Sequence, residues 1–147
     1  LSDTKKPSFI IWAQKDKNSA PLQRIQIIKG FYSEKDRETK EYLIDVVCSD
    51  GLKPDPNSKL CASNNAMVNI ETCEFSKNKG ASELKTTWVD EEYDPNIETF
   101  YYVRVLENPT CRWSTWDAIK NNYEPRQGID EIIQERAWSS PIWVNSN

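Results

Sequence analysis

Histidine is absent from the 147 residues of this chain. Its absence excludes Ser-His-Asp and Cys-His nucleophile systems, and it excludes zinc or iron sites that use imidazole ligands. An enzyme could still work through lysine or through carboxylates such as Asp90, Glu91, Glu92 and Asp94. Such a dense acidic run is typical of a solvated turn, because catalytic carboxyl pairs need shielding to hold different pKa values. Catalysis by this chain alone is therefore the least favoured hypothesis.

An excess of basic residues is also lacking. The 19 lysines and arginines and the 23 aspartates and glutamates are mixed along the chain and give a formal net charge of −4. Because no continuous basic face is available to neutralise phosphates, nucleic acid is not an expected partner. The sequence does not indicate an oligomeric state.

Long apolar runs are missing as well. No window approaches the roughly 20 apolar residues that a membrane-spanning helix requires, so no membrane span is expected. The first residues, LSDTKKPS, lack the apolar centre of a secretory signal, and the chain begins with Leu1 rather than Met. We therefore expect residues 1–147 to be one domain cut from a longer protein.

The four cysteines favour disulfides over a metal site. Cys48, Cys61, Cys73 and Cys111 lack the paired C-x-x-C spacing of a structural zinc site. Four cysteines allow three connectivities, and the turn-rich segment between the first two favours Cys48 with Cys61, which leaves Cys73 with Cys111. Four reduced, buried thiols are the alternative. Disulfides predict folding in an oxidising compartment, so we expect a periplasmic or secreted protein.

Short strands separated by turns account for most of the chain. The strand-like segments are rich in β-branched and aromatic residues, and several alternate apolar with polar side chains. Between them lie a turn cluster at residues 16–21, a charged hairpin-like connection at 33–41 and a long surface loop at 49–66. The predicted strands are residues 8–16, 22–32, 42–48, 67–73, 99–107 and 137–144.

This pattern predicts an all-β fold, a two-sheet β-sandwich with one short helical insertion. The helix is expected to begin at Ser114, with the Ser114 hydroxyl as N-cap and Asp117 at the capping-box spacing. The strand periodicity also assigns a set of side chains to the core. They are Ile11, Ile25, Ile27, Leu43, Val46, Tyr101, Val103, Val105 and Ile142.

A calcium site in the long loop is a further hypothesis. Asp50, Asp55 and Asn57 could supply oxygen ligands. The segment lacks the glycine and the terminal glutamate of a twelve-residue calcium loop at the required offsets, so solvated turn residues are the favoured interpretation.

Four phrases of the sequence resemble one family of large bacterial proteins, the domain of unknown function 3604 family. The phrases are RIQIIKGFY, DVVCSDG, FYYVRVLENPTCRWSTWDA and IQERAWSSPIWV. They are similar to the C-terminal part of these proteins, whose upstream part resembles metal-dependent hydrolases of the polymerase-and-histidinol-phosphatase type. The closing pattern resembles an immunoglobulin-like sandwich that ends many such hydrolases.

The resemblance implies a non-catalytic C-terminal accessory domain of a phosphoesterase-like hydrolase. It places no catalytic residue and no cofactor on this chain, and it implies a divalent metal only in the missing upstream domain. That upstream hydrolase domain is then the expected partner.

The stretch ENPTCRWSTWDA is the candidate docking surface. Arg112 can present a fork of donors to an anionic group, and Trp113 and Trp116 lie three residues apart on one side of a helix. Arg136 and Trp138 can join them if the last strand runs beside residues 100–107. A packed corner with no binding role is the alternative.

An independent glycan-binding module is the second function hypothesis. It rests on the six tryptophans and six tyrosines, since sugar rings stack on exposed aromatic faces. Trp12, Trp138 and Trp143 lie inside strand-like runs and are assigned to the core. Trp88, Trp113 and Trp116 remain as exposed candidates.

Overall fold

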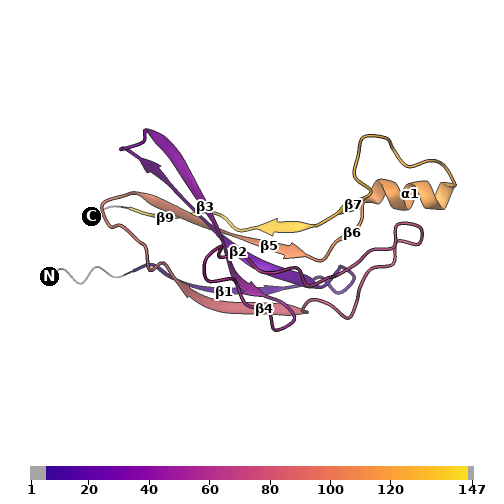
Figure 1. Cartoon of the computed structure of the whole chain (residues 1–147), viewed down its shortest axis with the longest axis horizontal. Helices are drawn as coiled ribbons and strands as arrows, with labels where there is room; N and C mark the ends of the chain where they lie inside the picture. The colour runs from indigo at the N-terminus through magenta and orange to yellow at the C-terminus, as the bar shows by residue number, and fades with distance from the viewer. Residues whose placement is uncertain (1–5, 146–147) are drawn as a thin grey trace.

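Two antiparallel β-sheets pack face to face in a computed structural model that describes residues 6–145 (Figure 1). One of these sheets has five strands and the other has two. A separate pair of two-residue strands and, within residues 6–145, a single short helix lie together at one end of the molecule (Figure 1). The prediction of an all-β sandwich with one helical insertion is confirmed. The finer immunoglobulin-like arrangement stays a prediction. No helix among residues 6–145 has the length and apolarity needed to cross a membrane.

The five-stranded sheet is built around β2 (Leu22–Ser33). Its neighbours are β3 (Glu38–Cys48) on one side and β5 (Thr99–Glu107) on the other. The two short strands β8 (Arg136–Trp138) and β9 (Ile142–Val144) share the far edge of β5. β2 has a strand on each side, and its three isoleucines, which lie on both of its faces, are fully buried.

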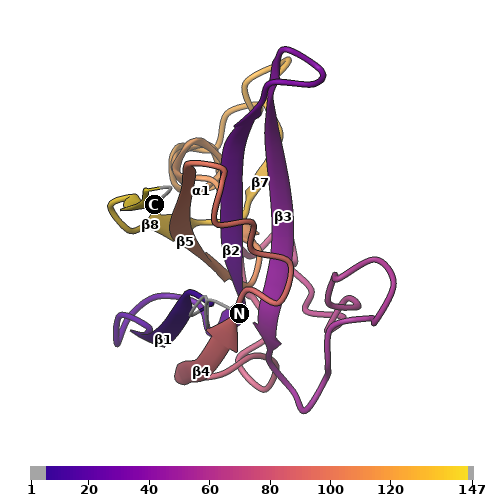
Figure 2. The same cartoon turned by 90° about the vertical axis from the view of Figure 1, so that its left-hand side faces the viewer.

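The charged connection between β2 and β3 is shorter than the sequence indicates. Both strands continue into the segment 33–41, and the turn itself occupies only residues 34–37. Arg37 takes a left-handed φ of 54° in this turn. The result is a long hairpin that projects beyond the two-stranded sheet (Figure 2).

The two-stranded sheet contains β1 (Ser8–Gln14) and β4 (Glu83–Val89). β1 is one of the predicted strands, whereas β4 was not predicted. The predicted strand at 67–73 is wrong: one isolated bridge joins Val68 to Phe75 there. The Asn69 side chain accepts hydrogen bonds from the backbone of Glu71 and Thr72, and this Asx-turn competes with strand pairing.

The core lies between the two sheets. Ile11, Ile25, Ile27 and Tyr101 are buried as predicted, and Val46, Val103 and Val105 pack against them together with the unpredicted Leu22 and Leu84. Two predicted core residues are wrong. Leu43 is 37% exposed because it pairs with Ile28 on the outer face of the sheet, and Ile142 is 53% exposed because β9 is an edge strand.

The helix α1 (Trp113–Asn121) follows β6 (Thr110–Cys111) and lies beside β7 (Ile132–Ile133). It begins one residue earlier than predicted, and the predicted capping box is wrong. The N-cap is Arg112, which makes no side-chain capping bond. The contact that secures the first turn is tertiary, because the Thr115 hydroxyl donates to the carbonyl oxygen of Glu131 at 2.8 Å.

Candidate functional site

The predicted docking corner lies beyond the end of β5, where β6 leads into α1 (Figure 1). Arg112 is engaged in holding this corner: its Nε donates to the carbonyl of Asp130 at 2.9 Å, and its backbone N–H donates to Glu131 at 2.8 Å. Trp113 is 71% exposed. Trp116 is less exposed and faces a hollow lined by residues 73–78. At this corner the Trp113 indole is therefore exposed and available for binding, while the Nε donor of Arg112 is already used in a hydrogen bond within the domain.

Arg136 lies elsewhere on the surface. β8 does run beside β5 as the hypothesis required, with Arg136 opposite Leu106. Arg136 lines a separate hollow with Gln14 and Glu107, and neither Arg112 nor Trp116 contributes to it. The predicted site residues thus do not converge on one pocket in the part of the chain that the structure describes.

Four of the six tryptophans contradict the sequence prediction, whereas Trp113 and Trp116 are exposed as expected. Trp12, Trp138 and Trp143 were assigned to the core, yet all three are more than half exposed. Trp88, expected to be free, packs against the core beside Phe9 and Tyr101. The assignment to the core failed because alternating apolar and polar residues in a short edge strand do not show which face of the strand another element covers.

Several of these side chains gather on the outer face of the five-stranded sheet. Phe100 pairs with Trp143 across β5 and β9, with ring centroids 5.1 Å apart. The rings of Phe100 and Tyr102 lie nearly parallel, with centroids 6.4 Å apart. α1 lies at one end of the molecule and leaves this face uncovered (Figure 1). We call the surface the aromatic face; its members are Leu43, Phe100, Tyr102, Trp138 and Trp143.

Gly30 shapes the aromatic face from below. It lies opposite Phe100 in the β2–β5 pairing. A Cβ at Gly30 would lie 2.2 Å from the Phe100 ring, so only glycine lets the ring lie flat over β2. The position of Phe100 is therefore fixed by the backbone of the neighbouring strand.

A buried polar network occupies the other half of the same outer face. Asp45 accepts hydrogen bonds from Arg24 at 3.0 Å, from the Gln26 amide at 2.6 Å and from the backbone N–H of Cys61 at 2.6 Å. Arg104 extends the network through the Gln26 side chain. The long loop after β3 thus covers this half of the sheet, whereas the aromatic half stays open.

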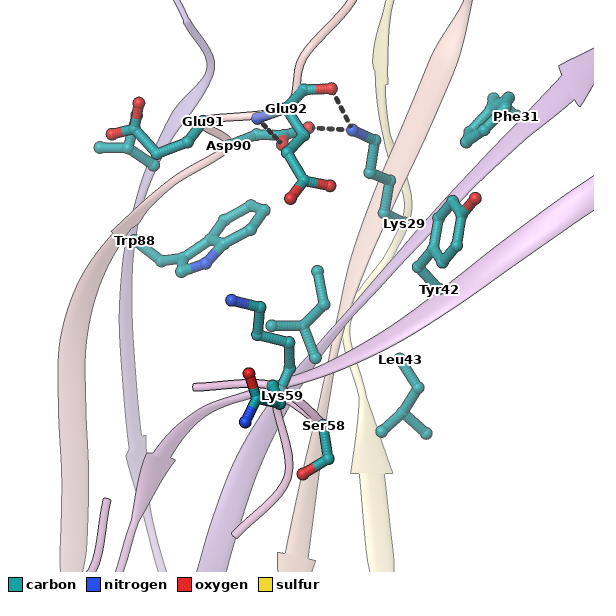
Figure 3. A pocket seen from close by; sticks show the side chains of 13 residues that line it. Lys29, Phe31, Tyr42, Leu43, Ser58, Lys59, Trp88, Asp90, Glu91 and Glu92 are labelled. Atoms are coloured by element: carbon teal, nitrogen blue, oxygen red, sulfur yellow. Dashed lines mark hydrogen bonds and ion pairs between the residues drawn. The ribbon is translucent and has the colours of Figure 1, made fainter. Parts of the chain in front are cut away.

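A groove of about 520 Å³ lies where the projecting hairpin passes the end of β4 (Figure 3). At its upper rim Lys29 forms an ion pair with Asp90, with Nζ and Oδ2 2.5 Å apart, and both side chains are buried. Lys29 also donates to the carbonyl of Glu92 at 3.1 Å, and the Tyr101 hydroxyl donates to Asp90 at 2.6 Å. Lys59 points across the groove toward Trp88 (Figure 3).

This ion pair corrects one sequence-based expectation. Asp90 was taken with its acidic neighbours as a solvated turn residue, but it is 3% exposed, whereas Glu91, Glu92 and Asp94 are exposed. Burial, followed by the hydrogen bond to Asp90, raises the pKa of Tyr101 far above its usual value. Asp90 is the ion-pair partner of Lys29 and the hydrogen-bond acceptor of Tyr101, and the three side chains cover the end of the core.

The loop carboxylates considered for calcium are bonded to their own loop. Asp55 accepts from the backbone N–H groups of Asn57 and Ser58, and these bonds lower its pKa. Burial raises the pKa of Asp50, but hydrogen bonds from Ser49, Gly80 and Asn64 outweigh burial and leave it lowered. Within residues 6–145, no group of three or more metal-ligating side chains is assembled.

Two disulfides join the cysteines in the predicted pairs. Cys48 bonds to Cys61 and ties the long loop to the end of β3. Cys73 bonds to Cys111 and ties the segment before β4 to β6, next to the docking corner. The pairing supports an oxidising environment for folding.

Comparison with known proteins assigns a family. The family model described as "Protein of unknown function (DUF3604)" matches residues 1–146. No curated protein and no solved structure matches the chain. Because the matched region spans nearly all of the sequence, the chain belongs to the DUF3604 family.

Proposed function

We propose that this domain is a non-catalytic accessory module that docks onto another domain of a DUF3604 protein through the aromatic face. The observation that carries the proposal is the exposure of Trp138 and Trp143 beside Phe100, Tyr102 and Leu43 on an open sheet. Contiguous exposed apolar patches mark interaction sites, and interface cores are enriched in tryptophan and tyrosine. The flat, well-packed rings on β5 suit a partner surface that is itself ordered.

The proposed partner is a metal-dependent, phosphoesterase-like hydrolase domain, which would hold the divalent metal. This part rests on the family resemblance together with the absence of histidine from the sequence. An immunoglobulin-like sandwich is the scaffold we propose. A periplasmic or secreted location is proposed from the two disulfides.

The experiment compares two exposed tryptophans in the longest natural polypeptide that contains this domain. Trp143→Ala removes an indole from the aromatic face, and Trp113→Ala removes an equally exposed indole from the predicted docking corner. We expect Trp143→Ala to reduce Mn²⁺-dependent hydrolysis of p-nitrophenyl phosphate esters, while the isolated domain keeps its circular dichroism spectrum. A truncated interface tryptophan typically costs about 2 kcal/mol or more of binding.

Each possible result decides between the surfaces. A loss that occurs only in Trp113→Ala assigns docking to the corner and overturns the aromatic face. Hydrolysis by the isolated domain, or no hydrolase sequence anywhere in the polypeptide, overturns the accessory role.

Glycan binding is the second candidate, favoured by one observation. Trp138 and Trp143 are exposed on the two short strands β8 and β9 that share one edge of β5, and exposed indoles can stack on sugar rings. Calorimetric titration with soluble xylan, laminarin and chito-oligosaccharides tests it. Binding that Trp143→Ala abolishes in the isolated domain favours a glycan module over docking.

A further inference from the structure

The free edge of β1 is a second unsatisfied surface. Within the described chain, β1 pairs with β4 alone, so its other edge presents backbone N–H and C=O groups with no neighbouring strand. Ile10 is 88% exposed and Trp12 is 65% exposed on the outward face of the same strand. An open strand edge with large apolar side chains is a template for pairing with another chain.

β1 carries none of the features that protect natural sheet edges. Charged residues make up 29% of the whole sequence, yet Ser8–Gln14 contains no charged residue and no proline. The other strand of the sheet differs, because β4 presents Glu83 and Lys85 on its outward face. The edge of β1 is therefore the less protected edge of this sheet and the one more open to pairing with another strand.

A groove of about 570 Å³ runs along this edge. Inward-facing and outward-facing side chains of β1 both line it, so it follows the edge itself rather than one face of the strand. The opposite wall comes from β8 and β9, where pairing with β5 is interrupted between Trp138 and Ile142. An added strand would lie beside β1 and cover apolar side chains on both walls.

A second copy of the chain fits this edge in one antiparallel register. If Ile11 faces the partner's Ile11 across a two-fold axis, Ile10 lies opposite the partner's Trp12, and Phe9 lies opposite the partner's Ala13. Aromatic and β-branched side chains are favourable cross-strand pairs. The same register brings Lys6, which pairs with Glu91 in its own chain, opposite the partner's Asp16. The apolar side chains of the strand and the opposite charges just beyond its two ends are therefore matched in this register.

We infer that the protein forms a homodimer in which two β1 strands pair through their free edges to make a continuous four-stranded sheet, β4-β1-β1-β4. The dimer uses the two-stranded sheet, whereas the proposed docking surface lies on the outer face of the five-stranded sheet. Trp138 lines both the groove along β1 and the aromatic face, but Trp143 lies outside the groove, so the Trp143 variant tests docking separately from the dimer.

Sedimentation equilibrium of the complete chain tests the dimer. We expect a mass of twice 17.1 kDa that falls toward the monomer on dilution. The double variant Ile10→Asp with Trp12→Asp places like charges directly opposite each other in this register and is expected to be monomeric. The matched control, Thr87→Asp with Lys85→Asp, changes the residues that pair with Ile10 and Trp12 on β4 and should remain dimeric.

A charge-swap experiment tests the register. Ile10→Lys with Trp12→Lys should also be monomeric alone, and mixing it with the aspartate variant should restore a heterodimer. Circular dichroism confirms that each variant is folded. A wild-type chain that stays monomeric at high concentration overturns the inference, as does a mixture that does not associate or an equal loss of dimer in the β4 control.

Discussion

Single residues hold this fold through a small number of saturated polar contacts. Asp45 is fully buried and accepts bonds from Arg24, Gln26 and the backbone of Cys61. Removing one partner of a buried ion pair leaves an uncompensated charge, which is strongly destabilising. Through its bond to Cys61, Asp45 holds the long loop against one half of the outer face of the five-stranded sheet.

Asp45→Ala is therefore expected to lower the free energy of unfolding by about 3–5 kcal/mol, because the Arg24 guanidinium loses its buried partner. Urea denaturation measures the change. The control is Asp36→Ala, which removes an exposed ion pair with Lys40 and should leave stability unchanged. Equal effects of the two substitutions would show that the Asp45 network contributes nothing beyond surface charge.

The buried hydroxyl of Tyr101 is expected to make the free energy of unfolding fall at alkaline pH. Its pKa is raised in the folded state by burial and by Asp90, with Tyr93 adding to the same direction and Lys29 paired to the same carboxylate. A raised folded-state pKa stabilises the protein below the unfolded value, near 10, and that contribution is lost as the pH rises further. The free energy of unfolding should therefore fall above pH ~10.

Tyr101→Phe isolates this effect. The variant should be less stable at neutral pH but should lose less stability between neutral and alkaline pH than the wild type does. Urea denaturation at a series of pH values measures both slopes. Identical slopes would show that the Tyr101 hydroxyl is not the group responsible.

Secondary-structure elements show where sequence reasoning succeeds. The strands at 22–32 and 99–107 were predictable because their β-branched and aromatic residues continue over many positions. β4 was missed although Leu84, Thr86 and Trp88 alternate with polar residues, because Thr86 leaves only two apolar side chains in the alternating series. The segment 67–73 has strand-like composition, but the Asn69 side chain and a left-handed Cys73 bend it into a turn.

The site was less predictable than the fold, for a physical reason. A period-two pattern separates two faces of a strand without saying which face another element covers. Leu43, Trp138 and Trp143 are apolar on strands and were therefore assigned to the interior or to its margin. They are exposed because they lie on the face of the five-stranded sheet that points away from the two-stranded sheet, and no local pattern encodes which face of a strand is covered.

The two disulfides close chain segments of very different length. Cys73–Cys111 closes a span of 38 residues and Cys48–Cys61 a span of 13. In the chain-entropy model, loops of these lengths correspond to roughly 4 and 3 kcal/mol of stabilisation. Cys73→Ser with Cys111→Ser should therefore lower the urea midpoint more than Cys48→Ser with Cys61→Ser. The reverse order would mean that strain or residual structure outweighs loop entropy.

At the scale of the whole molecule, each of the two main sheets carries one exposed apolar surface. One half of the outer face of the five-stranded sheet is the open aromatic face, and the other half is covered by the Asp45 network and the long loop. The two-stranded sheet carries the unprotected edge of β1, and the disulfide-linked corner with Trp113 lies at the far end. These exposed apolar surfaces are the ones through which we propose that the domain binds its partners.

Hydroxyl-radical footprinting of the tryptophans tests the central claim most directly. The isolated domain and the longest natural polypeptide that contains it are oxidised under the same conditions, and Trp143 and Trp113 are compared by mass spectrometry. Both indoles are exposed in the domain, so both should oxidise readily there. If the aromatic face docks, Trp143 becomes protected in the longer polypeptide while Trp113 oxidises as before. Equal oxidation of Trp143 in the two proteins would contradict the docking role of the aromatic face.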